Sequence, residues 1–176
     1  MYKSNIPKYP QYLSEDDSVI SELTLSSFTG MQIRNGPYGA LSSDQVSDGS
    51  IHVSIEKNSE NKTNISLFKW VLQNEILIHE SLLNYIFVIR PEIMKINQEC
   101  GFVIDDYSKI CTINELHKSI GIVLISIRSP DLESDPVLIL EIGTEWHYDQ
   151  HFCVIMNKLN PVKWDDCNSA YTDWYR

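Results

Sequence analysis

Apolar residues in the C-terminal part of the chain fall into three short runs that predict neighbouring strands. The three runs are Val137–Ile142, Phe152–Met156 and Pro161–Trp164. Runs of about five residues bounded by Gly, Asn and Pro are typical of strands. We therefore expect a β-meander over Val137–Trp164, in which a segment rich in aromatic, acidic and imidazole side chains, Glu145–His151, joins the first two strands.

The N-terminal part of the chain alternates apolar and polar residues in two places. The apolar positions of Val19–Ile33 predict one or two strands with a bend near Gly30. Strict alternation over Ile51–Glu56 predicts a half-buried strand. The polar, acidic segment Ser42–Ser50 is expected to be a surface loop, and residues 1–12, with two prolines and three tyrosines, an extended arm.

The middle of the chain has the spacing of a helix. Apolar residues recur every three or four positions over Phe68–Ile86, which places them on one helical face, and Asn64 has the residue type of an N-cap. The region is either one helix or two helices broken near Asn74. Pro91 is expected to stop or kink it, because the residue before a proline disfavours helical geometry. A further helical turn or two is expected over Glu92–Glu99.

A second helix and a central strand follow. Thr112 and Glu115 have the spacing of a capping box and predict a short helix, Asn114–Ser119. The continuous apolar run Ile120–Ile127 predicts a central strand. Because strands precede and follow a helical block, we expect one α+β domain over residues 1–176, with a largely antiparallel sheet and helices packed on one side.

Charge narrows the expected partners. The chain has 14 Lys and Arg residues against 24 Asp and Glu residues, a net charge of −10, and Ser129–Asn157 contains no base. Such a field repels nucleic acid and anionic membranes and attracts basic partners, so we expect neither nucleic-acid nor membrane binding. The alternative interpretation is that the acidity serves solubility alone.

Cellular location and cofactors follow from the absence of several sequence signals. The chain has neither a signal-peptide core nor a stretch near the ~20 apolar residues of a membrane span, which predicts a cytoplasmic protein. Its four cysteines show no close pairing, which disfavours a structural zinc site and suggests a reducing compartment, with Cys153 as a small core residue. Common hydrolase, phosphate-loop and zinc-protease motifs are missing, so we expect neither an enzyme nor a cofactor.

The most concentrated chemistry lies at His147, Asp149 and His151. At period two, three such side chains on a strand would point to one side and could bind a metal or transfer protons. The simplest interpretation is that these groups cap a turn beside a packed Trp146, and a protein-interaction surface is a second. His79 lies on the apolar helical face, where a hydrogen-bonded core or boundary histidine is expected rather than a ligand.

The C-terminal part of the chain resembles a family of uncharacterised bacterial domains. Members place a short helix and two apolar strands before a segment of the form Trp-Asp-x-Glu-His-Gly-x-Gly-Val, and a Gly-x-Ala-Asp-like turn closes the unit. In this chain the counterparts are Asn114–Ile127, Val137–Gly143, Trp146–Val154 and Asp165–Ala170, and the helical block Asn64–Tyr85 also corresponds. The glycines expected after the histidine are replaced here by Phe152 and Cys153.

The resemblance implies a partner protein. Relatives of this kind look like the small acidic immunity proteins encoded beside contact-dependent or secreted bacterial toxins. We therefore expect a protein that occludes the basic active site of a cognate toxin domain. The expected anchors are Trp146, Tyr148 and Asp149, with Glu145, Asp44 and Asp48 as steering charges. The alternatives are a metal-dependent enzyme that uses His147, Asp149 and His151, and a scaffold domain that binds another cytosolic protein.

Overall fold

The computed structural model describes residues 18–35, 39, 41–56, 62–102, 110–128 and 136–172, so the expected N-terminal arm lies outside the described residues. The elements, in chain order, are β1 (Ser18–Thr24), the 3-10 turn η1 (Ser26–Phe28), β2 (Gln32–Asn35), β3 (Leu41–Val46), β4 (Ser50–Glu56), α1 (Lys62–Gln73), α2 (Glu75–Glu99), α3 (Ile113–Ser119), β5 (Ile120–Arg128), β6 (Val137–Thr144), β7 (His151–Asn157), β8 (Asn160–Asp165) and α4 (Cys167–Thr172). The expected α+β class is confirmed.

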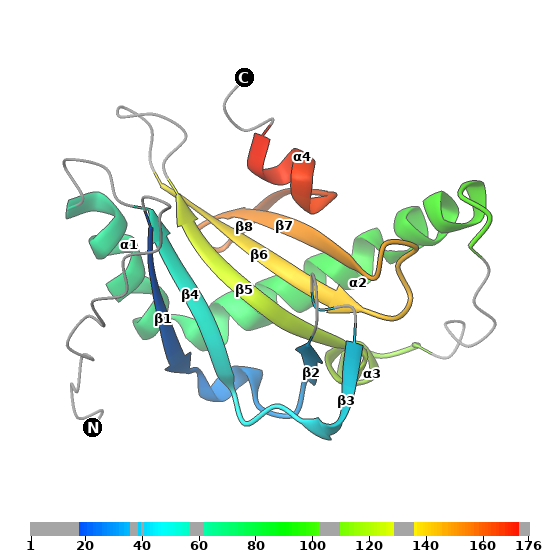
Figure 1. The fold of residues 1–176 in the computed structure, drawn as a ribbon, viewed down its shortest axis with the longest axis horizontal. Helices are drawn as coiled ribbons and strands as arrows, with labels where there is room; N and C mark the ends of the chain where they lie inside the picture. Colours follow the sequence, from blue (N-terminus) through cyan, green and yellow to red (C-terminus); the bar gives the residue numbers. More distant parts are fainter. Residues whose placement is uncertain are drawn as a thin grey trace.

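A six-stranded sheet forms the centre of the molecule, with the strand order β1-β4-β5-β6-β7-β8 (Figure 1). The expected meander is confirmed as β6, β7 and β8, which pair antiparallel with their neighbours. The pair β4–β5 is parallel, so the sheet is mixed. Parallel neighbours cannot be joined by a tight turn, and the chain between them makes a crossover that contains α1, α2 and α3. This crossover carries the helical layer across the sheet.

The long helical region is divided at Asn74, one of the two alternatives that the spacing allowed. The Asn74 side chain donates to the Trp70 carbonyl over 2.8 Å, and its backbone leaves helical geometry with φ −122°. Two expectations nearby are wrong. Asn64 lies inside α1 and donates to the Glu56 carbonyl rather than capping the helix. Pro91 lies inside α2, which continues to Glu99, so the proline does not stop the helix; packing against the sheet outweighs the loss of one helical hydrogen bond.

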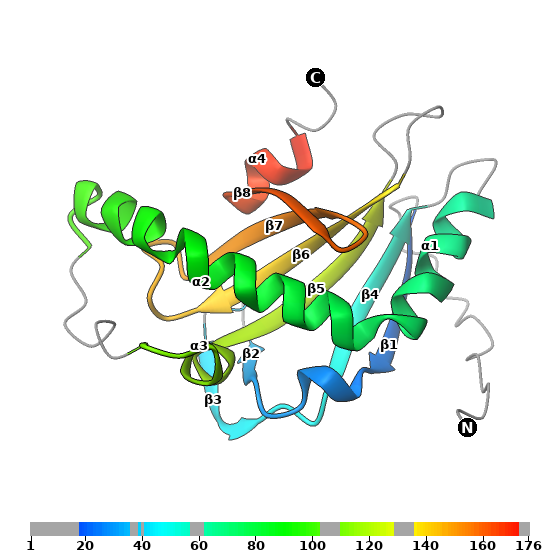
Figure 2. The same ribbon diagram turned by 180° about the vertical axis from the view of Figure 1, so that it is seen from behind.

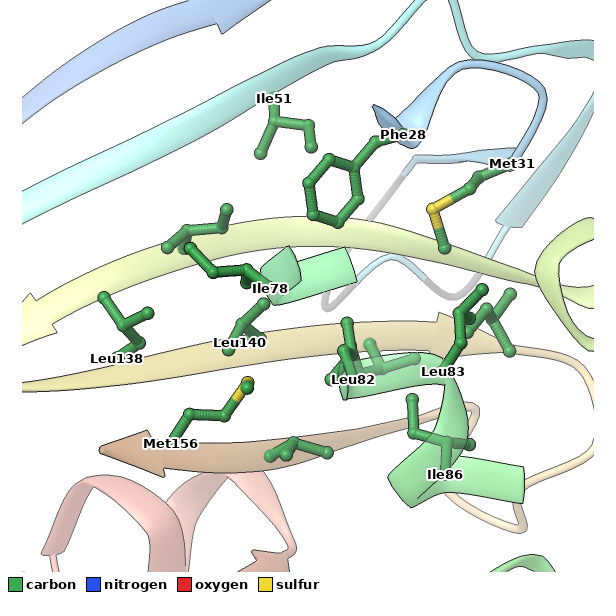
Figure 3. Packing of buried hydrophobic residues seen from close by; sticks show 14 of the residues in the cluster. Phe28, Met31, Ile51, Ile78, Leu82, Leu83, Ile86, Leu138, Leu140 and Met156 are labelled. Carbon is green, nitrogen blue, oxygen red and sulfur yellow. The ribbon is translucent and has the colours of Figure 1, made fainter. Parts of the chain in front are cut away.

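Helix α2 lies across one face of the sheet (Figure 2). Its side chains Ile78, Leu82 and Ile86 are at most 1% exposed and pack toward Leu138 and Leu140 of β6 (Figure 3). The even-numbered residues of β6 point to this face, because side chains alternate between the two faces along a strand. This cluster is the main hydrophobic core and stabilises the position of α2 over the meander.

Helix α4 covers the opposite face of the sheet, so the expectation of helices on one side is wrong. Figure 1 shows α4 on the side of β7 away from α2. The odd-numbered β6 residues Val137 and Ile139 form a second buried cluster with Cys153 of β7 and with Cys167 and Ala170 of α4. Both faces of β6 are therefore covered. A strand covered on both faces has a continuous apolar sequence, and such a run does not reveal which face carries which helix.

Residues 42–46 of the expected loop Ser42–Ser50 belong to strand β3, which pairs antiparallel with β2, so this part of the expectation is wrong. The apolar ends of β3 are exposed, Leu41 by 63% and Val46 by 68%, so the strand has no buried face that its sequence could signal. The β2–β3 hairpin is placed by Arg34, whose buried side chain crosses the paired glycines Gly121 and Gly143. A Cβ at Gly143 would lie 2.8 Å from Arg34 Cγ, so this approach requires glycine there.

The expected capping box and central strand are confirmed. Thr112 Oγ1 accepts from the Glu115 N–H over 3.2 Å, and Glu115 Oε2 accepts from the Cys111 N–H over 2.8 Å. Glu115 Oε2 also accepts from the Thr112 hydroxyl over 2.9 Å, and the bonds to this carboxylate, the Cys111 bond most strongly, hold the pKa of Glu115 below its usual value. The short helix α3 then leads directly into β5, which lies between β4 and β6 in the sheet.

Candidate functional site

Two backbone hydrogen bonds of Gln150 close the connection between β6 and β7, residues 145–150. The Thr144 N–H donates to the Gln150 carbonyl over 2.9 Å, and the Gln150 N–H donates to the His147 carbonyl over 2.8 Å. Gln150 takes a positive φ of 59°, which completes the turn. The segment is therefore a compact, internally bonded loop, and its side chains divide between the core and the solvent.

Trp146 belongs to the core. Its side chain is 0% exposed, its indole N–H donates to Ser119 Oγ over 3.3 Å, and its ring lies 5.8 Å from the ring of Phe152. The expectation that Trp146 anchors a partner is wrong, because the ring could reach one only by leaving the hydrophobic core. The burial of Trp146 instead confirms the interpretation in which the loop is a turn beside a packed tryptophan.

Asn97 of α2 holds the backbone of this loop. Its side chain is 1% exposed; Nδ2 donates to the Trp146 carbonyl over 2.6 Å, and Oδ1 accepts from the Tyr148 N–H over 3.0 Å. A single side-chain amide thus bonds both a backbone carbonyl and a backbone N–H of a loop that is distant in sequence. Sequence reasoning did not identify Asn97, although a polar residue on the apolar face of a helix was the available signal.

His147 is also buried; its ring packs at a tilt against Tyr148 and Phe152 and meets Trp164 edge to face. Burial lowers the pKa of His147 to about 4, since the apolar surroundings disfavour the charged ring; nearby Asp149 opposes this shift. The ring is therefore neutral at pH 7, and its Nδ1 accepts from the Asp149 N–H over 3.2 Å. It acts as a structural part of the loop.

His151 lies on the other face of the sheet from His147. Its Nδ1 is 2.8 Å from the Asp149 carbonyl, and its side chain also bonds Cys167. His147, by contrast, packs with Phe152 on the α2 side. Among the described residues, no group of three or more His, Cys, Asp or Glu side chains is placed to hold a metal ion. The set His147, Asp149 and His151 therefore does not form the metal site that one alternative requires.

Four side chains of the loop face the solvent, and we call three of them, Glu145, Tyr148 and Asp149, the loop surface; the fourth is Gln150. Tyr148 is 39% exposed, Glu145 is 54% exposed, and Asp149 is exposed. The pKa of Tyr148 is raised by partial burial and then by the charge of Asp149, so the phenol is neutral and available as a donor. The surface combines a ring and two carboxylates on a rigid support.

Glu145 also connects the loop surface to the β2–β3 hairpin. Its Oε1 lies 3.7 Å from Nη1 of Arg34, and it accepts a hydrogen bond from Ser42 Oγ. Arg34 further donates from Nε to the Gly39 carbonyl over 2.8 Å. Part of the Glu145 charge therefore balances a buried guanidinium, and Asp149 is the better candidate for attracting a distant base.

The two remaining expected charges lie elsewhere on the hairpin. Asp44 is in β3, and the structure does not describe its side chain. Asp48 is exposed and accepts from the Ser50 N–H over 2.9 Å, which stabilises the turn into β4. Asp48 lies six residues beyond Ser42, which contacts Glu145, and an extended segment of that length spans about 20 Å. Among the described residues, the hydrogen bonds of Asp48 are to Ser50 and Thr29.

His79 is the boundary histidine that its position predicted. Its Nε2 lies 3.0 Å from Nδ1 of His117, and its ring meets Phe28 edge to face. Burial and the neighbouring His117 lower the pKa of His79 to about 4. The pair joins α2 to α3, and His117 continues the chain of bonds to the Thr29 carbonyl over 3.1 Å.

Comparison with known proteins adds no assignment. No protein-family model, no curated protein and no solved structure matches this chain. Within the part of the chain that the structure describes, no helix has both the length and the apolar character needed to cross a membrane.

Proposed function

We propose that this chain is a binding protein that neutralises a basic partner protein by covering its active site. The observation that carries the proposal is the loop surface, on which Tyr148, Asp149 and Glu145 face the solvent while Trp146 and His147 hold the same loop in the core. The resemblance to immunity proteins of bacterial toxin systems suggests the partner, a cognate toxin domain with a basic cleft.

Rigidity of the loop favours tight binding. Asn97 bonds the backbone on both sides of His147, so the exposed side chains are held before any partner arrives. A preorganised surface loses less conformational entropy on binding than a flexible one, and more of the contact energy appears as affinity. Tyr148 takes the anchoring role expected of Trp146, since an interfacial tyrosine is a common source of binding energy.

Charge supports the choice of partner. The net charge is −10, and Asp149 is an exposed acid within the loop surface. A negative field around the contact surface speeds the encounter with a positive one, and salt weakens this effect by screening. A basic cleft that normally binds an anionic substrate would be covered by such a surface, which gives inhibition without any chemical step.

The test is binding to candidate toxin domains, beginning with any toxin encoded directly before this gene. Association and dissociation rates are measured at low and high salt for the unaltered chain and for Asp149→Lys, Tyr148→Ala and the control Glu80→Lys. Glu80 is an exposed acid on α2, outside the loop surface. We expect Asp149→Lys to slow association about tenfold or more at low salt. Tyr148→Ala should speed dissociation about thirtyfold, the equivalent of about 2 kcal/mol.

Two outcomes would contradict the proposal. One is the absence of a complex with any neighbouring toxin domain. The other is a complex in which Asp149→Lys and Glu80→Lys behave alike, because the contact would then lie elsewhere. A gene with no toxin gene beside it, together with stable binding to another cytosolic protein, would instead identify the scaffold alternative.

A further inference from the structure

Two cysteines and a histidine meet beneath α4, on the sheet face opposite α2. Cys153 and His151 lie two residues apart on β7, so their side chains share a face. Cys153 pairs with Asp165 of β8, and the chain returns two residues later as Cys167 at the start of α4. Cys153 and Cys167 belong to one buried cluster, and interactions with Cys153 and His151 are among the causes that lower the pKa of Cys167. The fold therefore joins three groups that the sequence separates.

The bonds of His151 orient its ring. A carbonyl oxygen only accepts hydrogen bonds, so Nδ1 carries a proton and donates it to the Asp149 carbonyl over 2.8 Å. With Nδ1 used in this bond, Nε2 is the nitrogen for the bond to Cys167. A nucleophile beside a base that is itself oriented by a third group is the arrangement typical of an activated thiol.

The surroundings give the two thiols different protonation. The interaction with Cys153 lowers the pKa of Cys167 most strongly and that with His151 adds to it; burial, and to a smaller extent the charge of Glu141, opposes the shift. The bond to Cys167 raises the pKa of His151 to about 9. Burial raises the pKa of Cys153, which remains a neutral thiol. Cys167 therefore has the more thiolate character, and thiolates are the reactive form.

We propose that Cys167 and Cys153 form a dithiol that hydroperoxides oxidise to an intramolecular disulfide, with His151 as the proton donor. Exposure sets the order of attack, because Cys167 is 6% exposed and Cys153 is 0% exposed. Both thiols lie in the same buried cluster between β7 and α4, so the second step needs no large movement of the chain.

The chemistry takes place in two steps. The Cys167 thiolate attacks one oxygen of hydrogen peroxide and the O–O bond breaks; the leaving hydroxide takes the proton of the His151 imidazolium and departs as water, which leaves Cys167 as a sulfenic acid. The Cys153 sulfur then attacks the Cys167 sulfur, the S–O bond breaks, and the hydroxyl leaves as water with the Cys153 proton. Two thiols are oxidised by two electrons, and one peroxide is reduced to two waters.

The experiment uses the full chain carrying Cys100→Ser and Cys111→Ser, since these two cysteines are exposed and would react separately. The protein is treated with one equivalent of hydrogen peroxide, unfolded, alkylated and weighed by mass spectrometry. We expect the loss of two hydrogens and a peptide that links Cys153 to Cys167. In the unaltered chain, Cys167 should react at least about tenfold faster than Cys100, because thiolate character governs the rate.

Three variants in this background separate the roles. Cys153→Ser should stop at a sulfenic acid on Cys167, detected by dimedone capture, and Cys167→Ser should leave Cys153 reduced. His151→Gln should slow oxidation of Cys167 about tenfold or more, whereas a merely structural role would lower stability and leave this rate unchanged. Circular dichroism of each variant checks its fold.

The unaltered chain decides the question even if a variant fails to fold. If peroxide oxidises Cys100 while Cys153 and Cys167 both remain open to alkylation after unfolding, the proposal is wrong. Equal oxidation rates for Cys167 and Cys100 would also overturn it, because the hydrogen bonds would then give Cys167 no special reactivity.

Discussion

Replacing Asn97 by alanine should loosen the loop that carries the proposed binding surface. The substitution removes the donor to the Trp146 carbonyl and the acceptor for the Tyr148 N–H. Each hydrogen bond contributes about 1 kcal/mol net, and a buried backbone group left without a partner costs about 1–3 kcal/mol. Alanine recovers about 0.5 kcal/mol through its higher helix propensity. We expect Asn97→Ala to lower the free energy of unfolding by about 2–4 kcal/mol.

Urea and thermal unfolding measure this effect. For a chain of this size, 1 kcal/mol shifts Tm by about 2–4 °C, so Tm should fall by about 5–15 °C. Hydrogen exchange should quicken at the Tyr148 amide, which loses its acceptor, more than in the β6 strand. The matched control is Gln98→Ala, since Gln98 is the next residue of α2 and is exposed; its effect should stay within about 0.5 kcal/mol.

Asn97→Asp tests the same bonds through charge. The carboxylate still accepts from the Tyr148 N–H, but at neutral pH it has no proton to donate to the Trp146 carbonyl. Its folded-state pKa should therefore be raised, and the stability lost relative to the unaltered chain should be partly recovered as the pH falls and the carboxyl protonates. If Asn97→Ala and Gln98→Ala have equal stability, or if Asn97→Asp loses the same free energy at every pH, the assigned role is refuted.

Three further predictions follow from burial and close packing. Trp146→Ala should lower the free energy of unfolding by about 3–5 kcal/mol, because a fully buried ring leaves a cavity. Gly143→Ala should cost about 1–3 kcal/mol, since its Cβ would lie 2.8 Å from Arg34 Cγ. The pKa of His147 is about 4 in the folded chain and 6.5 in the unfolded chain, so the free energy of unfolding falls by up to about 3 kcal/mol as the pH decreases through that range. His147→Phe should remove this part of the pH dependence.

Each of these has a control in urea unfolding. Tyr148→Ala, at an exposed position of the same loop, should cost less than about 1 kcal/mol, and a larger loss there than at Trp146 would contradict the assigned burial. Gly143→Ala should cost little in an Arg34→Ala background; an unchanged cost would mean that Arg34 is not the obstacle. If the free energy of unfolding falls equally with decreasing pH in the unaltered chain and in His147→Phe, the ring of His147 does not titrate as a buried group.

Local sequence patterns determined most of the elements. The apolar runs of β5, β6 and β7 and the capping box at Thr112 and Glu115 are local features that predicted their elements. The spacing left open whether the helical region is one helix or two, and the structure shows the break at Asn74. The alternation of apolar residues predicted β4 for the same reason, since a half-buried strand repeats every two positions. Patterns of this kind need no knowledge of which distant element lies alongside.

The tertiary structure decided which side chains of those elements meet the solvent. Trp146 and Tyr148 are both aromatic residues of one acidic loop, and only the position of α2, with Asn97, places the first in the core and the second outside. The face on which α4 packs, and with it the meeting of Cys153 with Cys167, depends on how β8 pairs with β7. Spacing along a chain reports contacts over one or two turns, whereas burial depends on elements far apart in sequence.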